Sequence, residues 1–196
     1  ASALTVHSDM SISHIAHRGT HEQKQKYLPA ACAGEKVGAV CVTEPHAGSD
    51  VAGLKTRAVK TDKGWVINGS KTYITNGVFG DIYIVAARTD PEAKGSRGIS
   101  LFVVEKGNPG LKIARKFEKH GWRSSDTAEL FLDDLQVPHD ALLTYIDPDR
   151  AGSFMTGSRA FGLQLSAVYL GIAMAARDFA LDFADRYHSH SLGGSI

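Results

Sequence analysis

The stretch Val40-Cys41-Val42-Thr43-Glu44-Pro45-His46-Ala47-Gly48-Ser49-Asp50 decides the fold of this chain. It begins with apolar residues typical of a strand, and it breaks at Pro45 into a loop of small residues. Such a loop can bring backbone N–H groups and the Thr43 and Ser49 hydroxyls against a flat polar ring or a phosphate. A Pro/Gly turn between two strands needs no ligand, so this segment alone fits either a binding loop or an ordinary turn.

Further along the chain, the sequence continues as a series of short strands. Runs rich in Val, Ile and aromatic residues are separated by turn clusters such as Asp62-Lys63-Gly64, Asn68-Gly69 and Asn76-Gly77. Short strands at close spacing predict a small antiparallel barrel or sandwich. The predicted strands are Val37 to Thr43, Trp65 to Asn68, Thr72 to Thr75, Ile82 to Ala87, Ile99 to Val104 and Glu129 to Leu132.

Helical patterns flank this β-rich middle on both sides. Residues 11–33 are predicted to be helical, because Thr20 followed by Gln23 is a capping-box signature, and Gly34 is a plausible end. Residues 153–187 are also predicted to form a helix, which is apolar around most of its circumference. Such a helix must be buried among other helices, so we expect another subunit or residues after Ile196 to cover it.

Composition excludes several classes of protein. With 43% hydrophobic and 22% charged residues among 196, the chain is an ordinary globular protein of one or two units. A net charge of +1 argues against nucleic-acid or membrane-surface partners. Cys32, Cys41 and the nine histidines form no pattern of metal ligands, and a reducing compartment fits best. The uncharged stretch 160–176 is interpreted as a buried helix, not as a membrane span.

Two further segments carry candidate functional residues. Asn68-Gly69-Ser70-Lys71-Thr72-Tyr73-Ile74-Thr75-Asn76-Gly77 is a turn, a short strand and a second turn, with Tyr73 and Thr75 on one face. The segment from Gly121 to Pro138 contains Arg123-Ser124-Ser125-Asp126-Thr127 and is a polar turn that leads into a strand. No GxGxxG, GxxxxGK[ST] or GxSxG motif is present, which removes the main support for Rossmann, P-loop and α/β-hydrolase folds.

Taken together and in this order, the three segments resemble the middle domain of the acyl-CoA dehydrogenase family, whose patterns are TEPxAGSD, INGxKxxITNG and GxRxSDT. The resemblance runs from about Ser11 to Leu143 and more loosely to Ile196. It implies an α+β fold with an antiparallel β-barrel middle domain, flanked by helical segments that belong to incomplete helical domains. The implied division is 1–36 for the end of the N-terminal helical domain, 37–147 for the barrel and 148–196 for the start of the C-terminal bundle.

The resemblance also implies a flavin enzyme. In the family a carboxylate removes the Cα proton of an acyl-CoA, the Cβ hydride passes to flavin N5, and an electron-transferring flavoprotein reoxidises the flavin. Family members act in fatty-acid β-oxidation, as dimers or homotetramers, in the mitochondrial matrix or the bacterial cytoplasm. Carried over by position, the FAD-binding residues are Val40, Val42, Thr43, Gly48, Ser49, Tyr73, Ile74 and Thr75, and the acyl-CoA-binding residues are Ser49, Ser125 and Asp126.

The resemblance supplies no catalytic carboxylate in this segment. In most members the base lies beyond the equivalent of Ile196, and in a minority it lies early in the helix that starts near Ser153. Alignment from Leu192-Gly193 places that position at Leu163, followed by Gln164, and neither can act as a base. We therefore expect weak FAD binding and no turnover. A flavin oxidase or monooxygenase of the same fold, and a non-catalytic subunit that docks through residues 161–174, remain alternatives.

Overall fold

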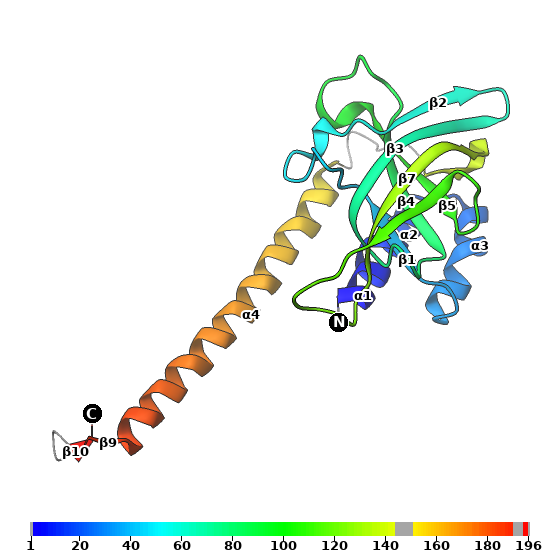
Figure 1. Cartoon of the computed structure of the whole chain (residues 1–196). Coiled ribbons are helices and arrows are strands. Elements are labelled where there is room, and N and C mark those ends of the chain that lie inside the picture. The colour runs from blue at the N-terminus through cyan, green and yellow to red at the C-terminus, as the bar shows by residue number, and fades with distance from the viewer. Residues whose placement is uncertain (1, 144–150, 190–193, 196) are drawn as a thin grey trace. The chain divides into compact units, whose positions relative to one another are not determined.

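The computed structural model describes residues 2–143, 151–189 and 194–195, with side chains described over residues 3–143 and 166–187. The chain divides into two compact units, Ala1–Tyr145 and Ile146–Ile196. The first unit contains short helices and an eight-stranded sheet, and the second contains one long helix (Figure 1). Helices and a sheet in one chain confirm the α+β fold class.

The first unit begins with four helical elements: α1 (Ser2–Thr5), the π-helix η1 (Val6–Ile12), α2 (Ser13–Arg18) and α3 (His21–Cys32). The capping box predicted at the start of α3 is confirmed. The Gln23 N–H donates to the Thr20 hydroxyl over 3.2 Å, and the Thr20 N–H donates to the Gln23 side chain over 2.8 Å. The predicted end is confirmed as well, because Gly34 follows the helix at φ 76°, a conformation that glycine adopts without steric cost.

The sheet is mixed and open, which corrects the expected antiparallel barrel. β1 pairs with β4 in parallel, and the remaining strands follow the order β6-β7-β3-β2-β4-β5-β8, with no pairing between β6 and β8 among the described residues. Three short 3-10 helices lie between these strands. The strands are β1 (Gly38–Cys41), β2 (Arg57–Thr61), β3 (Gly64–Thr75), β4 (Ile82–Arg88), β5 (Ile99–Glu105), β6 (Leu111–Lys116), β7 (Thr127–Val137) and β8 (Leu142–Leu143), and the 3-10 segments among them are η2 (Val51–Gly53), η3 (Gly95–Gly98) and η4 (His139–Ala141).

The turn expected at Asn68-Gly69 is wrong, because both residues lie inside β3. β3 pairs with β7 along its length, with a register shift between Ile67 and Gly69. A Cβ atom at Gly69 would lie 2.3 Å from the Thr56 hydroxyl oxygen. The missing side chain at Gly69 therefore lets the backbone around Thr56 approach β3 closely, a role that glycine often has within strands.

β4 lies at the centre of the unit and is buried on both faces. Ile82 and Ile84 belong to a cluster with residues of α2 and α3, including Ile15 and Tyr27. Every second residue of β4 from Tyr83 onward faces the main core, to which the other strands also contribute. The alternation follows from the two-residue period of a strand. The helices therefore cover one face of β4, and the curved sheet encloses the other.

The second unit contains α4 (Ala151–Arg186) and the short strands β9 (His188–Ser189) and β10 (Gly194–Ser195). The helix predicted from Ser153 is confirmed, whereas Leu192 and Gly193 lie outside the described residues, as do the side chains of Leu163 and Gln164. Large apolar side chains of α4, among them Leu170, are exposed. Among the described residues, no helix is both long enough and apolar enough to cross a membrane.

Candidate functional site

The three segments that carry the candidate residues meet along β3. The Thr72 N–H donates to the Thr43 carbonyl over 2.9 Å, which joins β3 to the loop after β1. Thr75 lies opposite Thr127 in the pairing of β3 with β7, and the Asn76 N–H donates to the Asp126 carbonyl over 3.2 Å. Segments about 30 and 50 residues away in sequence are therefore held against the same strand end.

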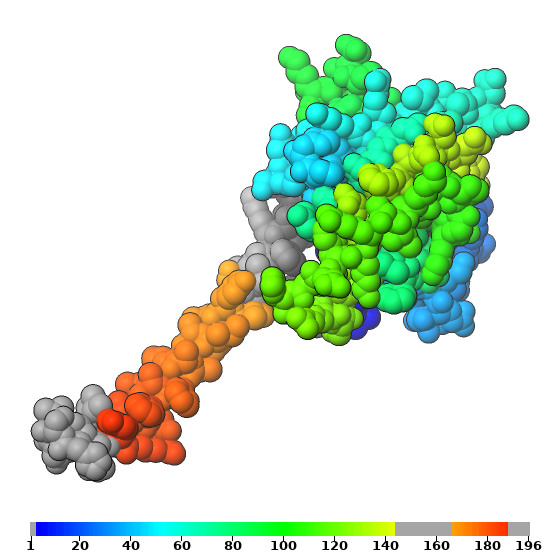
Figure 2. All heavy atoms as spheres, in the orientation of Figure 1, coloured from blue at the N-terminus to red at the C-terminus, as the bar shows by residue number. Residues whose placement is uncertain are grey.

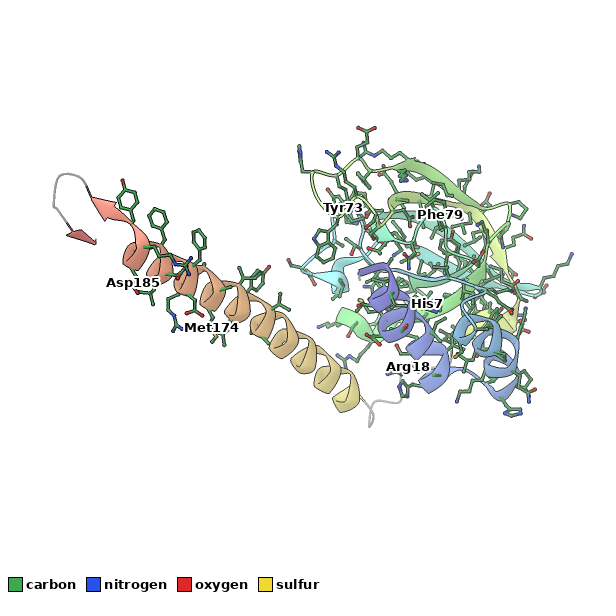
Figure 3. The ribbon with its side chains drawn as sticks, turned by 90° about the horizontal axis from the view of Figure 1, so that it is seen from below. His7, Arg18, Tyr73, Phe79, Met174 and Asp185 are labelled. Atoms are coloured by element: carbon green, nitrogen blue, oxygen red, sulfur yellow. The ribbon has the colours of Figure 1, made fainter. Side chains whose placement is uncertain are left out.

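Tyr73 projects from a bulge in β3. The register with β7 shifts between Lys71 and Ile74, and Tyr73 adopts φ 57°, a conformation that is uncommon for a bulky residue. The side chain is 66% exposed, whereas the neighbouring Ile74 is only 2% exposed. Figure 3 shows Tyr73 at the margin of the sheet unit. The bulge turns this ring outward, and unusual backbone conformations of this kind cluster at functional sites.

The remaining candidates differ in their surroundings. Val40 lies in β1, and Val42 and Thr43 follow it as half-buried residues. Gly48 and Ser49 are exposed in the loop beyond them, and no described contact joins these two residues to Tyr73. Ile74 and Thr75, at the end of β3, are respectively buried and half-buried, and Ser125 and Asp126 lie buried just before β7.

A buried ion pair that the sequence analysis did not identify anchors the loop. Lys71 Nζ lies 2.8 Å from a carboxylate oxygen of Glu44, and the two side chains are 0% and 1% exposed. The ammonium also donates to the Val42 carbonyl over 3.2 Å. The Glu44 carboxylate accepts from the backbone N–H groups of Lys55 and Thr56 over 2.6 and 3.0 Å. These bonds hold the loop that contains Thr43 to β3 and to the start of β2.

Glu44 should make the stability of the fold sensitive to acid. Burial by itself raises the pKa of Glu44, but the hydrogen bonds from Lys71 and the two backbone N–H groups outweigh burial and hold the pKa below its usual 4.5. Because the folded state lowers this pKa, the stabilisation is present above about pH 4.5 and is lost as pH falls through the lowered value. We expect urea unfolding between neutral pH and acid to show this loss.

A matched pair of variants assigns that loss to Glu44. The double variant Glu44→Gln with Lys71→Met lacks both charges and should show a flatter dependence of unfolding free energy on pH than the unmodified chain. The control Glu118→Gln removes an exposed carboxylate and should leave the dependence unchanged. Parallel curves for the double variant and the unmodified chain would contradict this role.

A second set of bonds shapes the turn after β3. The Asn76 side chain donates to the carbonyls of Ala3 and Gly38, each over 2.9 Å, and the residue is 2% exposed at φ 62°. A carboxylate oxygen of Asp126 accepts from the Val78 N–H over 2.6 Å. Asp126 thus orders the turn through its side chain, in addition to the substrate contact that we predict for it.

Three hydroxyls of the candidate set are available to a ligand. In the part of the chain with described side chains, the hydroxyls of Thr43, Ser49 and Thr75 hydrogen-bond to no protein group. Thr43 and Thr75 are half-buried; the Thr72 N–H bonds the Thr43 carbonyl, and Thr75 ends the same strand, β3. Over the same residues, no three His, Cys, Asp or Glu side chains gather into a possible metal site. The arrangement suits a flat polar ligand that accepts and donates hydrogen bonds at its edge.

Comparison with protein families identifies two consecutive matches. Residues 39–135 match the model described as acyl-CoA dehydrogenase, middle domain. Residues 1–35 match the model described as acyl-CoA dehydrogenase, N-terminal domain. The two matches occur in the order that the sequence resemblance implies.

Curated relatives share about two fifths of their residues with this chain. The mitochondrial isovaleryl-CoA dehydrogenase of Arabidopsis thaliana is 42% identical over 179 residues, which cover 90% of this chain and 43% of the relative. An acyl-CoA dehydrogenase of Bacillus subtilis is 41% identical over 181 residues, covering 92% and 47%. The chain therefore spans less than half the length of these relatives.

Solved structures show the same likeness. Butyryl-CoA dehydrogenase from Megasphaera elsdenii superimposes with a TM-score of 0.79 at 38% identity, covering 96% of this chain and 49% of that one. An FAD complex of PigA gives a TM-score of 0.83 at 27% identity, covering 99% and 50%. The family matches, the relatives and the fold agree, and the chain belongs to the acyl-CoA dehydrogenase family.

Proposed function

We propose that this chain is the FAD-binding part of an acyl-CoA dehydrogenase. The observation that carries the proposal is the meeting of the three family segments at the end of β3, where the Thr72 N–H reaches the Thr43 carbonyl. The flavoproteins among the solved neighbours, including an FAD complex, support this cofactor. The family's reaction, α,β-desaturation of an acyl-CoA thioester, is the activity that we propose for the complete enzyme.

The residues at the end of β3 fit a flavin. Tyr73 would cover one face of the ring system, because the bulge turns its ring outward, and the Thr43 and Thr75 hydroxyls would bond the ring edge. Ser49 would lie near the pyrophosphate and the pantetheine chain. Val40, Val42, Gly48 and Ile74 would complete the flavin surface, and Ser125 and Asp126 would contact the acyl-CoA.

In the proposed reaction, bound FAD supplies the acceptor for the Cβ hydride. The residues of this chain bind and orient the cofactor and shield it on one face, and the Glu44–Lys71 pair keeps the Thr43 loop in position. The α-proton requires a carboxylate base, which we place outside this segment. Catalysis by this segment alone is therefore not expected.

Assembly, partners and compartment follow the same reasoning. Named relatives act on acyl-CoA substrates and include mitochondrial and bacterial enzymes. We propose an acyl-CoA substrate, electron transfer to an electron-transferring flavoprotein, assembly into dimers or tetramers, and the mitochondrial matrix or bacterial cytoplasm as the compartment. The exposed apolar side chains of α4 support assembly, because large exposed apolar areas mark interaction sites.

The direct test is a titration of the chain with FAD, followed by flavin fluorescence and by the visible spectrum. We expect quenching of flavin fluorescence by Tyr73 and a saturable, weak affinity. A chain that is shown to be folded by circular dichroism, yet neither quenches nor perturbs the flavin, would contradict the proposal. If flavin binds and is reduced photochemically, rapid reoxidation by oxygen would favour the oxidase alternative.

Replacing Thr75 by Val should weaken FAD binding by roughly two- to twelvefold, because the variant removes one hydrogen bond worth about 0.5–1.5 kcal/mol and keeps the shape of the side chain. The fluorescence titration measures this change. The matched control is Thr61→Val at the far end of β2, which should leave the affinity unchanged. An equal loss in both variants would indicate a general effect on folding.

A further inference from the structure

The side chain of Arg88, at the end of β4, joins two surface loops. Its guanidinium donates to the Ala52 carbonyl over 2.7 Å. It also makes longer contacts, of 3.4 Å each, with the carbonyls of Ala93 and Gly95. Among the residues with described side chains, no carboxylate forms an ion pair with Arg88. The planar guanidinium suits this role, because its donors point in several fixed directions at once.

Ala52 lies in a loop that comprises residues 47–54 and contains Ser49, and we call it the Ser49 loop. Backbone hydrogen bonds fix its first end at Ala47, and burial of the Leu54 side chain fixes its last end. Most residues between these two ends are exposed. The guanidinium therefore holds the loop shortly after Ser49, in a part of the loop where packing supplies little support.

The second loop comprises residues 89–98, and we call it the Asp90 loop. The N–H groups of Thr89 and Asp90 donate to the Gly98 carbonyl over 2.9 and 3.2 Å, which closes the loop at its base. A Cβ atom at Gly98 would lie 3.0 Å from a guanidinium nitrogen of Arg88, so the glycine lets the loop pack against the cation. η2 of the Ser49 loop contacts η3 of the Asp90 loop. Figure 2 shows both loops at the surface of the sheet unit, the first in light blue to cyan and the second in green.

The sheet fixes the backbone from which the guanidinium extends. The Arg88 N–H donates to the Thr56 carbonyl over 2.8 Å, and Arg88 pairs with Arg57 where β4 runs parallel to β2. The two loops lie outside the strands, whereas the residue that bridges them lies within one. Because contiguous contacts carry coupling between parts of a protein, a displacement of one loop passes to the other through this side chain.

We propose that Arg88 is a positioning residue that couples the two loops and thereby fixes Ser49 for its ligand. The inference rests on the proposed function in one respect, which is that Ser49 contacts the FAD pyrophosphate and the acyl-CoA. In this role Arg88 acts on the ligand only through Ser49. The Asp90 loop has no predicted ligand contact, yet ligand binding at Ser49 should restrain it, because coupling between two parts of a protein is reciprocal.

Amide hydrogen exchange in the ligand-free chain tests the bridge itself. The Gly53 N–H donates to the Asp50 carbonyl over 3.2 Å, and the Glu92 N–H donates to the Asp90 carboxylate over 2.9 Å, so the exchange of these amides reports the opening of each loop. In Arg88→Met both amides should exchange faster by about fivefold or more, whereas the amides of β4 should stay within about twofold. General unfolding would instead speed exchange in β4 as well.

The matched control is Arg57→Met. Arg57 is exposed and pairs with Arg88 between β2 and β4, so this variant removes the same charge from the adjacent strand and leaves the guanidinium of Arg88 on both loops. It should keep the exchange of both loops within about twofold of the unmodified chain. Faster exchange in only one loop, or equal acceleration in the two variants, would overturn the proposal.

The fluorescence titration with FAD tests the effect on Ser49. Arg88→Met should weaken FAD affinity by about threefold or more, and Arg88→Lys by less, because an ammonium still reaches one carbonyl. Arg57→Met should leave the affinity within about twofold of the unmodified chain. Faster loop exchange in Arg88→Met without a loss of affinity beyond that of Arg57→Met would refute the positioning role. Should Arg88→Met not fold, Arg88→Lys must still show both the faster exchange and the weaker affinity.

Exchange in the presence of FAD separates this proposal from the proposed function. Bound FAD should slow exchange of the Glu92 amide by about twofold or more in the unmodified chain, and should have no such effect in Arg88→Met. Equal slowing in the two proteins would show that the loops communicate without Arg88 and would overturn the proposal. Failure of the chain to bind FAD would refute the proposed function, and exchange in the FAD-free variants would still decide whether Arg88 couples the two loops.

Discussion

Replacing Lys71 by Met is expected to lower the free energy of unfolding by about 3–5 kcal/mol, because it leaves the Glu44 carboxylate buried without its counter-ion. The Val42 carbonyl loses a hydrogen-bond donor at the same time. Urea unfolding followed by circular dichroism measures the change. Since this pair holds the loop that contains Thr43, FAD affinity should fall together with stability.

Two further variants show whether the loss comes from the unpaired charge. Adding Glu44→Gln to Lys71→Met removes that charge and should recover at least half of the lost stability, because replacing both partners of a buried pair is often close to neutral. Lys112→Met breaks an exposed pair, whose side chains are 57% and 62% exposed, and should cost less than about 1 kcal/mol. A cost for Lys71→Met that is no larger than for Lys112→Met would refute the anchoring role.

Replacing Asn76 by Ala is expected to cost about 3 kcal/mol. Two buried hydrogen bonds, to the carbonyls of Ala3 and Gly38, are worth about 1 kcal/mol each. The conformation at φ 62° costs alanine about 1 kcal/mol more, because asparagine tolerates this region and alanine does not. Thermal and urea unfolding both report the change.

The variant Asn76→Gly divides this cost between its two causes. Glycine adopts φ 62° freely but cannot make the side-chain bonds, so we expect a loss of about 2 kcal/mol, roughly 1 kcal/mol less than for alanine. Equal losses in the two variants would show that backbone conformation contributes nothing. Losses below about 1 kcal/mol in both would show that the turn is held by other contacts, such as the bond from Val78 to Asp126.

Elements of the fold with a strong local pattern could be predicted from the sequence. Elements that no local pattern specifies were missed. The capping box at Thr20 and the buried strand Ile82–Arg88 were predicted because their signals are local. The strand Arg57–Thr61 was missed, since among its residues only Ala58 is buried. The strand Leu111–Lys116 was missed because it is a charged edge strand. Parallel pairing of β1 with β4 depends on tertiary packing and has no local signal.

The candidate site shows the same limit. The motifs named the loop around Thr43 and the strand end at Tyr73, and the structure brings the two segments together. The buried partnership of Glu44 with Lys71 went unnoticed, because Lys71 stands between the polar residues Ser70 and Thr72 and nothing local marks it as buried. The stacking of Phe117 on Tyr73 joins residues 44 positions apart and could not be read from spacing.

The placement of the two tryptophans gives the molecule a pair of optical reporters with separate meanings. Trp65 packs edge-on against Phe102, with centroids 5.4 Å apart, so its emission follows the integrity of the interior. Trp122 is 72% exposed, so its emission follows what touches the surface around it. Because the chain contains only these two indoles, a single Trp→Phe exchange isolates either signal. Unfolding and binding at the surface around Trp122 can therefore be followed independently without attaching a dye.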